Sequence, residues 1–134
     1  KDRYLRNHPL FKKAKEILTL VEAIIETLPE EEKEIYAPIL MESALMLAPK
    51  IAGAINSGSW LICMQNAALI RYHAQYLLVS TSGMRMEQKI DENYIKVMRT
   101  EMEEFRSLFV DWVKEINALE REDYTDEWGL FLRN

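Results

Sequence analysis

Hydrophobic residues recur at alternating steps of four and three along most of the chain. The first run consists of Leu10, Ala14, Ile17, Val21, Ile24 and Leu28. This spacing places the side chains along one face of an α-helix and is typical of a helix packed nearly parallel to its neighbours. We therefore predict a first helix over about residues 9–28. It should begin at Pro9, because proline suits the first helical position, and end before Pro29.

Three further runs with the same spacing predict helices over about residues 30–56, 59–80 and 92–119. The second run is Leu40, Ala44, Leu47, Ile51 and Ala54. The third is Trp60, Cys63, Ala67, Ile70, Ala74 and Leu77, and the fourth is Met98, Met102, Phe105, Phe109, Trp112, Ile116 and Leu119. With short or medium connections and no β pattern, these helices predict an all-α fold. We expect one antiparallel up-down-up-down four-helix bundle over residues 1–134.

The ends of the third and fourth helices carry recognisable capping residues. Ser59 or Ser57 can cap the start of the third helix with its hydroxyl group. Gly83 follows a polar Ser-Thr-Ser stretch and is suited to a left-handed residue after the end of that helix. Asp91 can cap the fourth helix. These residues set the predicted boundaries.

Two prolines interrupt the second run. Pro38 is expected near a late start of the second helix. Pro49 is expected inside the helix and should bend it, because proline lacks the N–H that would bond the preceding turn.

The charge balance bears on nucleic-acid binding. The 134 residues carry a formal net charge of −5, which argues against a general nucleic-acid binder because phosphate contacts need clustered Lys and Arg. One basic cluster, Lys12, Lys13 and Lys15, is nevertheless a candidate nucleic-acid contact. The simpler interpretation is a solvated helix face.

The sequence contains no recognisable metal-binding or catalytic motif, so we predict no cofactor and no enzymatic activity. A di-iron site in a helical bundle needs Glu-x-x-His pairs, whereas Leu5 and Ile70 stand three residues before His8 and His73. A lone cysteine and two distant histidines do not suit zinc, and no phosphate-binding glycine loop occurs. Cys63 falls in the apolar run and is expected in the core.

The single cysteine and the hydropathy of the chain bear on its cellular compartment. With one cysteine no intramolecular disulfide can form, which fits a reducing compartment, so we expect a cytoplasmic protein. No uncharged apolar run approaches about 20 residues, so no membrane partner is expected.

A polar row on the third helix is the candidate ligand site. Ser59, Asn66, His73 and Ser80 lie seven residues apart and share one side of the helix, with Arg71 on the other flank. Asn66, Arg71 and His73 could line a polar groove for a small molecule or a partner. The alternative is a row of boundary residues at the edge of the bundle.

The C-terminal segment, residues 123–134, is rich in aromatic residues. Tyr124, Trp128 and Phe131 would form an exposed apolar patch if they stayed in solvent. Gly129 offers a place to turn. We expect Trp128 and Phe131 to dock on the open end of the bundle or on a neighbouring subunit.

Two short motifs resemble a known family. Leu28-Pro29 is similar to the Phe-Pro boundary before helix two in the four-helix-bundle proteins encoded by intervening sequences of bacterial ribosomal RNA genes. Residues 50–54, Lys-Ile-Ala-Gly-Ala, share Ile51 and Ala52 with that family's Asn-Ile-Ala-Glu-Gly motif. Accessory proteins of diversity-generating retroelements are relatives of this family. The resemblance implies a bundle that forms homo-oligomers, pentameric in the retroelement branch, where a basic surface binds nucleic acid.

These observations favour a non-enzymatic interaction or scaffold protein that associates with itself and has an unknown protein partner. Residues outside the apolar runs, such as Tyr72 and Tyr76, supply surplus aromatic surface for this. The alternative is a nucleic-acid-binding accessory protein of the kind that the resemblance implies. A small-molecule binder that uses the polar row ranks third.

Overall fold

The computed structural model describes residues 2–121, 128 and 129 of the chain. Five helices account for most of them: α1 (Asp2–Asn7), α2 (Pro9–Glu26), α3 (Glu30–Ser57), α4 (Trp60–Met86) and α5 (Glu92–Asn117). No strand occurs in these described ranges. The prediction of an all-α fold is therefore confirmed.

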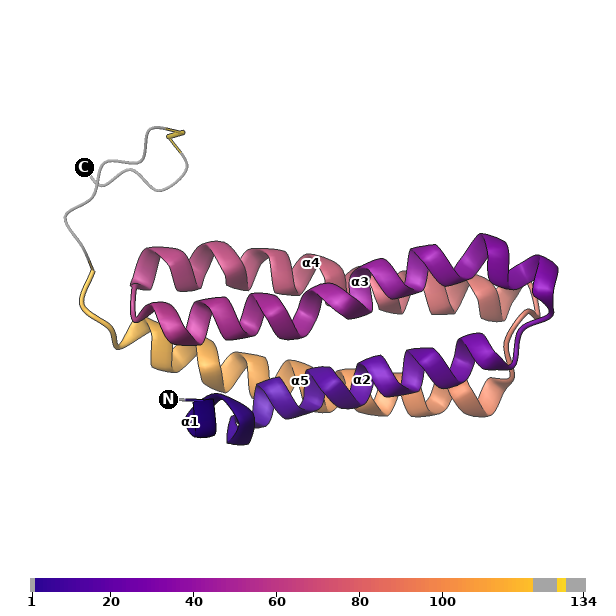
Figure 1. Ribbon diagram of the computed structural model, residues 1–134, viewed down its shortest axis with the longest axis horizontal. Helices are drawn as coiled ribbons and strands as arrows, with labels where there is room; N and C mark the ends of the chain where they lie inside the picture. Colours follow the sequence, from indigo (N-terminus) through magenta and orange to yellow (C-terminus); the bar gives the residue numbers. More distant parts are fainter. Residues whose placement is uncertain (1, 122–127, 130–134) are drawn as a thin grey trace.

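The four long helices lie side by side along the long axis of the molecule (Figure 1). α2 packs against α3 and α5, and α4 packs against the same two helices. The short α1 lies at one end and contacts α2 and α3. Each long helix thus has two neighbours and turns one face toward a shared interior.

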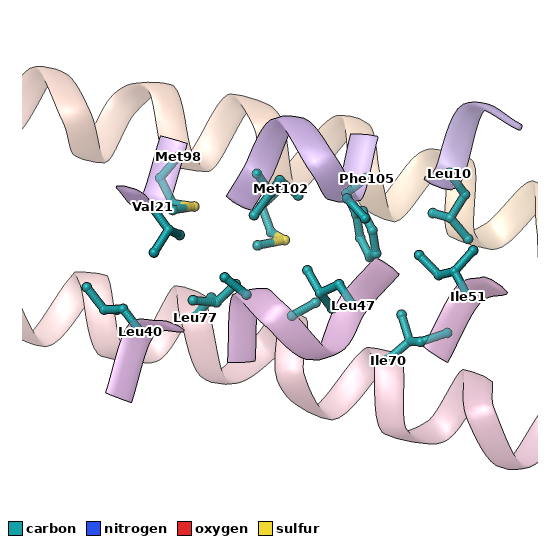
Figure 2. Packing of buried hydrophobic residues seen from close by; sticks show 14 of the residues in the cluster. Leu10, Val21, Leu40, Leu47, Ile51, Ile70, Leu77, Met98, Met102 and Phe105 are labelled. Carbon is teal, nitrogen blue, oxygen red and sulfur yellow. The ribbon is translucent and has the colours of Figure 1, made fainter. Parts of the chain in front are cut away.

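The predicted apolar runs form that interior. Figure 2 shows Leu10 and Val21 of α2, Leu47 of α3, Leu77 of α4 and Phe105 of α5 directed into the same space. The runs on α2 and α3 are buried over their whole length. Cys63 is buried as expected, and its thiol donates to the Ala54 carbonyl at 3.2 Å. On the remaining helices Trp60 and Phe109 are half-buried, and Leu119 is exposed beyond the end of α5.

Most predicted helix starts are confirmed by capping contacts. Pro9 is the first residue of α2, and the His8 ring accepts from the Leu10 amide at 3.2 Å. Ser59 accepts from the Ile62 amide at 3.2 Å and caps α4. Asp91 accepts from the Asn93 amide at 2.7 Å and caps α5. Local side-chain chemistry therefore sets these starts.

Two features of the N-terminal half of the chain differ from the prediction. Asp2–Asn7 is helical, whereas no helix was expected there because six residues are too few to show a period. Pro38 lies well inside α3 rather than near a late start, since α3 begins at Glu30 with three glutamates in its first turn. Carboxylates there are stabilised by the positive end of the helix dipole. Pro49 lies inside α3 as predicted.

The prediction that the third helix ends near residue 80 at a Gly83 cap is wrong. α4 continues through Gly83 to Met86, and the left-handed residue that follows is Gln88, with φ 58°. The helix continues because Met84 extends the buried run and the Thr81 hydroxyl donates to the Leu77 carbonyl at 2.8 Å. Polar residues at 80–82 therefore do not break it.

A substitution at Gly83 tests whether residues 81–86 are helical. Gly83→Ala should raise the free energy of unfolding by about 0.5–1 kcal/mol, because alanine loses less conformational entropy in a helix and nothing lies within 4 Å of the added Cβ. Gly58→Ala is the matched control. It has the same open space but a φ of 64°, so it should destabilise by about 1 kcal/mol. Urea unfolding followed by circular dichroism measures both. A loss of stability in Gly83→Ala would contradict the helical assignment of residues 81–86.

Candidate interaction surface

The side of α4 that faces away from the interior is apolar. Its large exposed side chains are Ile62, Leu69, Tyr72, Tyr76, Val79 and Met86, which we call the α4 outer face. Ile62, Leu69 and Tyr76 lie seven residues apart, as do Tyr72, Val79 and Met86. This is a second heptad pattern on the opposite side of the helix from the buried one. A stripe of this kind matches the face that a helix presents to a packing partner.

Few charges interrupt the α4 outer face. Residues 60–86 contain no acidic residue, and their only formal charges are Arg71 and Arg85. The neighbouring α3 also exposes Ile35 and Leu45. Exposed apolar side chains on two neighbouring helices are unusual for a surface that faces only water. The exposed side of α5, by contrast, carries charged residues such as Glu103 and Arg106.

Tyr72 is held in place by its neighbours. Its ring stacks on Tyr76 with centroids 6.1 Å apart and meets the His73 ring edge-on at 5.2 Å. Aromatic side chains held in this way lose little conformational entropy on binding, and tyrosine is enriched among residues that dominate binding energy. The pair lies near the middle of the α4 outer face.

The structure does not bring Asn66, Arg71 and His73 into one site. Nδ1 of His73 lies 3.2 Å from the hydroxyl of Ser43, which is buried on α3. Asn66 donates to the Ile62 carbonyl of its own helix at 2.8 Å. Arg71 lies two residues before His73, which on an α-helix directs it to the other side, toward α5. The geometry of Asn66 and His73 matches boundary residues whose partners lie within the fold.

The three lysines of α2 also diverge. Nζ of Lys13 lies 2.8 Å from Glu101 and 2.7 Å from Glu16, and it also pairs with Glu104. Desolvation lowers the pKa of Lys13, but its hydrogen bonds to Glu101, Glu104 and Glu16 outweigh this and raise the pKa above the ordinary lysine value. The charge of Lys13 is therefore engaged by carboxylates of α2 and α5.

The other two lysines project from a different side of α2. Nζ of Lys15 lies 5.4 Å from the centre of the Phe11 ring, and Lys12 is exposed. A joint phosphate-binding surface would need all three ammonium groups on one face. Lys12 and Lys15 do not form that surface with Lys13.

A groove between α4 and α5 was not predicted. It has a volume of about 720 Å³, with Ala74 and Leu78 of α4 opposite Met102, Phe105 and Phe109 of α5. Arg71, Arg99, Glu103 and Arg106 surround these apolar residues. Volumes of this size are typical of ligand sites. Two features of the sequence could have indicated the groove. One is the small residue Ala74 of α4, and the other is the pair Arg99 and Arg106, which lie seven residues apart on α5.

The predicted C-terminal docking residues fall largely outside the described part of the chain. Tyr124 and Phe131 lie among residues 122–127 and 130–134, which the structure does not describe. The Trp128 side chain is 88 % exposed, so it is not buried against its own chain. The Arg121 guanidinium lies 4.3 Å from the centre of the Trp60 ring at the start of α4. Docking on a neighbouring subunit stays a prediction.

One described helix, α3, is long and apolar enough to cross a membrane by length and composition. Glu42 and Lys50 interrupt its apolar stretch, so the criterion of an uncharged run did not predict it. A third of its most apolar window, 33 %, is buried inside the fold. Core helices of water-soluble proteins pass the same test, so a single such helix is weak support for a membrane span.

Comparison with known proteins adds no assignment to this surface: no protein-family model, curated protein or solved structure matches the chain.

Proposed function

We propose that this chain is a non-enzymatic interaction protein that associates with itself through the α4 outer face. The exposed apolar heptad on α4 carries the proposal. Among the described residues, six of the thirteen exposed large hydrophobic side chains belong to this one helix. Proteins rarely leave a contiguous apolar stripe in water unless a partner covers it. A second copy of the chain is the partner that the surplus of tyrosines and the resemblance to oligomeric bundles favour.

The scaffold in this proposal is an antiparallel up-down-up-down four-helix bundle. The connections 27–29, 58–59 and 87–91 between the long helices are short. Short connections favour antiparallel packing of consecutive helices. The contact of α2 with α5 would then close the bundle and leave the outer faces of α3 and α4 available.

Mass measurement at several concentrations tests the proposal. Light scattering in the micromolar range should give a mass above the 15.8 kDa of one chain, and dilution should lower it. A mass of 15.8 kDa at every concentration would remove self-association as the function.

Nucleic-acid binding is the alternative function, and the charges of the chain disfavour it. Lys13 is engaged by three glutamates and the chain is acidic overall. We therefore expect no appreciable binding of RNA or DNA near physiological ionic strength in a fluorescence anisotropy titration. Sub-micromolar binding that weakens steeply with added salt would reverse the ranking. Loss of that binding in Lys12→Glu would then locate the contact.

A small-molecule site on the polar row ranks third. Nδ1 of His73 lies within hydrogen-bond distance of the Ser43 hydroxyl, and the Asn66 side chain donates to a carbonyl of its own helix. The row therefore offers few polar groups that converge on a ligand, as small-molecule sites require.

A further inference from the structure

The groove between α4 and α5 combines an apolar floor with a basic rim. Phe105 and Met102 form part of its floor and are almost fully buried, so the groove reaches down to the core. On the rim, Arg106 lies 3.1 Å from Glu103. Within the described residues, Arg71 and Arg99 have no ion-pair partner. Two uncompensated guanidinium groups beside an apolar groove favour an occupant that is both aromatic and acidic.

The C-terminal segment, residues 123–134, together with the preceding Glu122 has this composition. Its acidic residues are Glu122, Asp123, Asp126 and Glu127, and its large apolar side chains are Tyr124, Trp128, Leu130, Phe131 and Leu132. It contains a single basic residue, Arg133. Carboxylates and aromatic rings therefore alternate within a few residues, which matches arginines placed around an apolar floor.

We propose that the groove between α4 and α5 binds the acidic, aromatic C-terminal segment of a second copy of this chain. Trp128 is 88 % exposed on its own chain, so the groove of the same chain does not hold it. The inference rests on the proposed self-association and adds a second contact to it, because the groove and the α4 outer face involve different residues. In the complex, carboxylates of the segment pair with Arg71 and Arg99 while Trp128 and Phe131 cover the floor.

The first experiment measures binding of the segment in trans. A fluorescein-labelled peptide of residues 120–134 is titrated with the full chain carrying Trp128→Ala and Phe131→Ala, which disable the resident segment. The peptide should bind, and Arg71→Glu or Arg99→Glu in the receptor should weaken binding at least tenfold. Lys12→Glu makes the same charge change on α2, away from the groove, and should alter binding less than twofold. No binding up to 200 μM (roughly 1,000-fold weaker than a specific sub-micromolar site), or equal effects of all three variants, would overturn the proposal.

The second experiment identifies which chain supplies the segment. In a Cys63→Ala background, one chain carries Gln75→Cys at the groove and a differently tagged chain carries Thr125→Cys. Mild oxidation of the mixture should trap a mixed disulfide dimer at least fivefold above a control pair with Lys12→Cys in place of Gln75→Cys. A third chain carries both Gln75→Cys and Thr125→Cys. A disulfide that forms within this chain, with no mixed dimer trapped in the mixture, would show that the occupant is the chain's own segment and would overturn the proposal.

Leu69→Glu separates this inference from the proposed function. The substitution lies on the α4 outer face, so peptide binding should stay within twofold of the parent. Peptide binding with an unchanged oligomer mass in Leu69→Glu would sustain the groove and refute the α4 interface. If Leu69→Glu lowers the oligomer mass but the parent receptor binds no peptide, the groove proposal is refuted and the α4 interface is not.

Discussion

In a chain whose C-terminal segment is disabled by Trp128→Ala and Phe131→Ala, replacing Leu69 with Glu should convert the self-associated chain into a monomer without unfolding it. Leu69 is 43 % exposed and lies near the middle of the α4 outer face, where a second copy would cover it. A carboxylate buried there without a partner loses its hydration, and such a change typically costs several kcal/mol. We expect association to weaken at least about 100-fold, or about 3 kcal/mol. Light scattering and sedimentation would report the change in mass.

The control for this substitution is Val97→Glu on α5. Val97 is exposed to a similar extent, 46 %, and also lies on a helix, but it is outside the α4 outer face. It should keep the parent mass. Both variants should keep the parent helix content, because glutamate is a good helix former. An unchanged mass in Leu69→Glu would exclude the α4 outer face as the interface.

Phe105→Ala should produce the largest loss of stability. Phe105 is among the largest fully buried side chains, and α5 directs it into the shared interior (Figure 2). Truncation of a buried Phe to Ala typically lowers the free energy of unfolding by about 3–5 kcal/mol, since apolar burial is lost and a cavity remains. Urea unfolding at a fixed protein concentration measures the change. The concentration is fixed because association adds to the apparent stability.

Val97→Ala on the same helix is the matched control. It removes apolar atoms from an exposed position and should shift the free energy of unfolding by no more than about 0.5 kcal/mol. A loss below about 1 kcal/mol in Phe105→Ala would mean that the interior around Phe105 is not closely packed.

The heptad spacing of apolar residues predicted the four long helices. The spacing is clearest on α2 and α5, because only one side of each of these helices is apolar. Capping side chains predicted several starts, since their bonds are local. Two features of the helices were not predicted. α1 is too short to show a period, and α4 passes Gly83 because Met84 is buried by other helices. Burial by distant residues is a tertiary effect that a glycine in the sequence does not reveal.

The interaction surface was only partly predictable. Tyr72 and Tyr76 were predicted to be surplus aromatic residues. The rest of the α4 outer face was not predicted, because its heptad pattern overlaps in the sequence with the heptad pattern of the buried residues of α4. The groove depends on how Ala74 of α4 meets Phe105 and Phe109 of α5, which no single helix specifies. The engagement of Lys13 by Glu101 and Glu104 likewise joins residues far apart in the chain. These features arise from helix pairing rather than from local pattern.

The ring of contacts among the long helices also bears on how fast the chain folds. Three of the four pairings join helices that follow one another, while the pairing of α2 with α5 spans all of α3 and α4. The entropy lost in closing a loop rises only slowly with its length, and helical domains rich in local contacts fold within about microseconds to milliseconds. The contact of α2 with α5 carries the largest closure cost. Substitutions at that contact, such as Lys13→Gln beside Glu101 and Glu104 of α5, should therefore speed unfolding more than they slow folding.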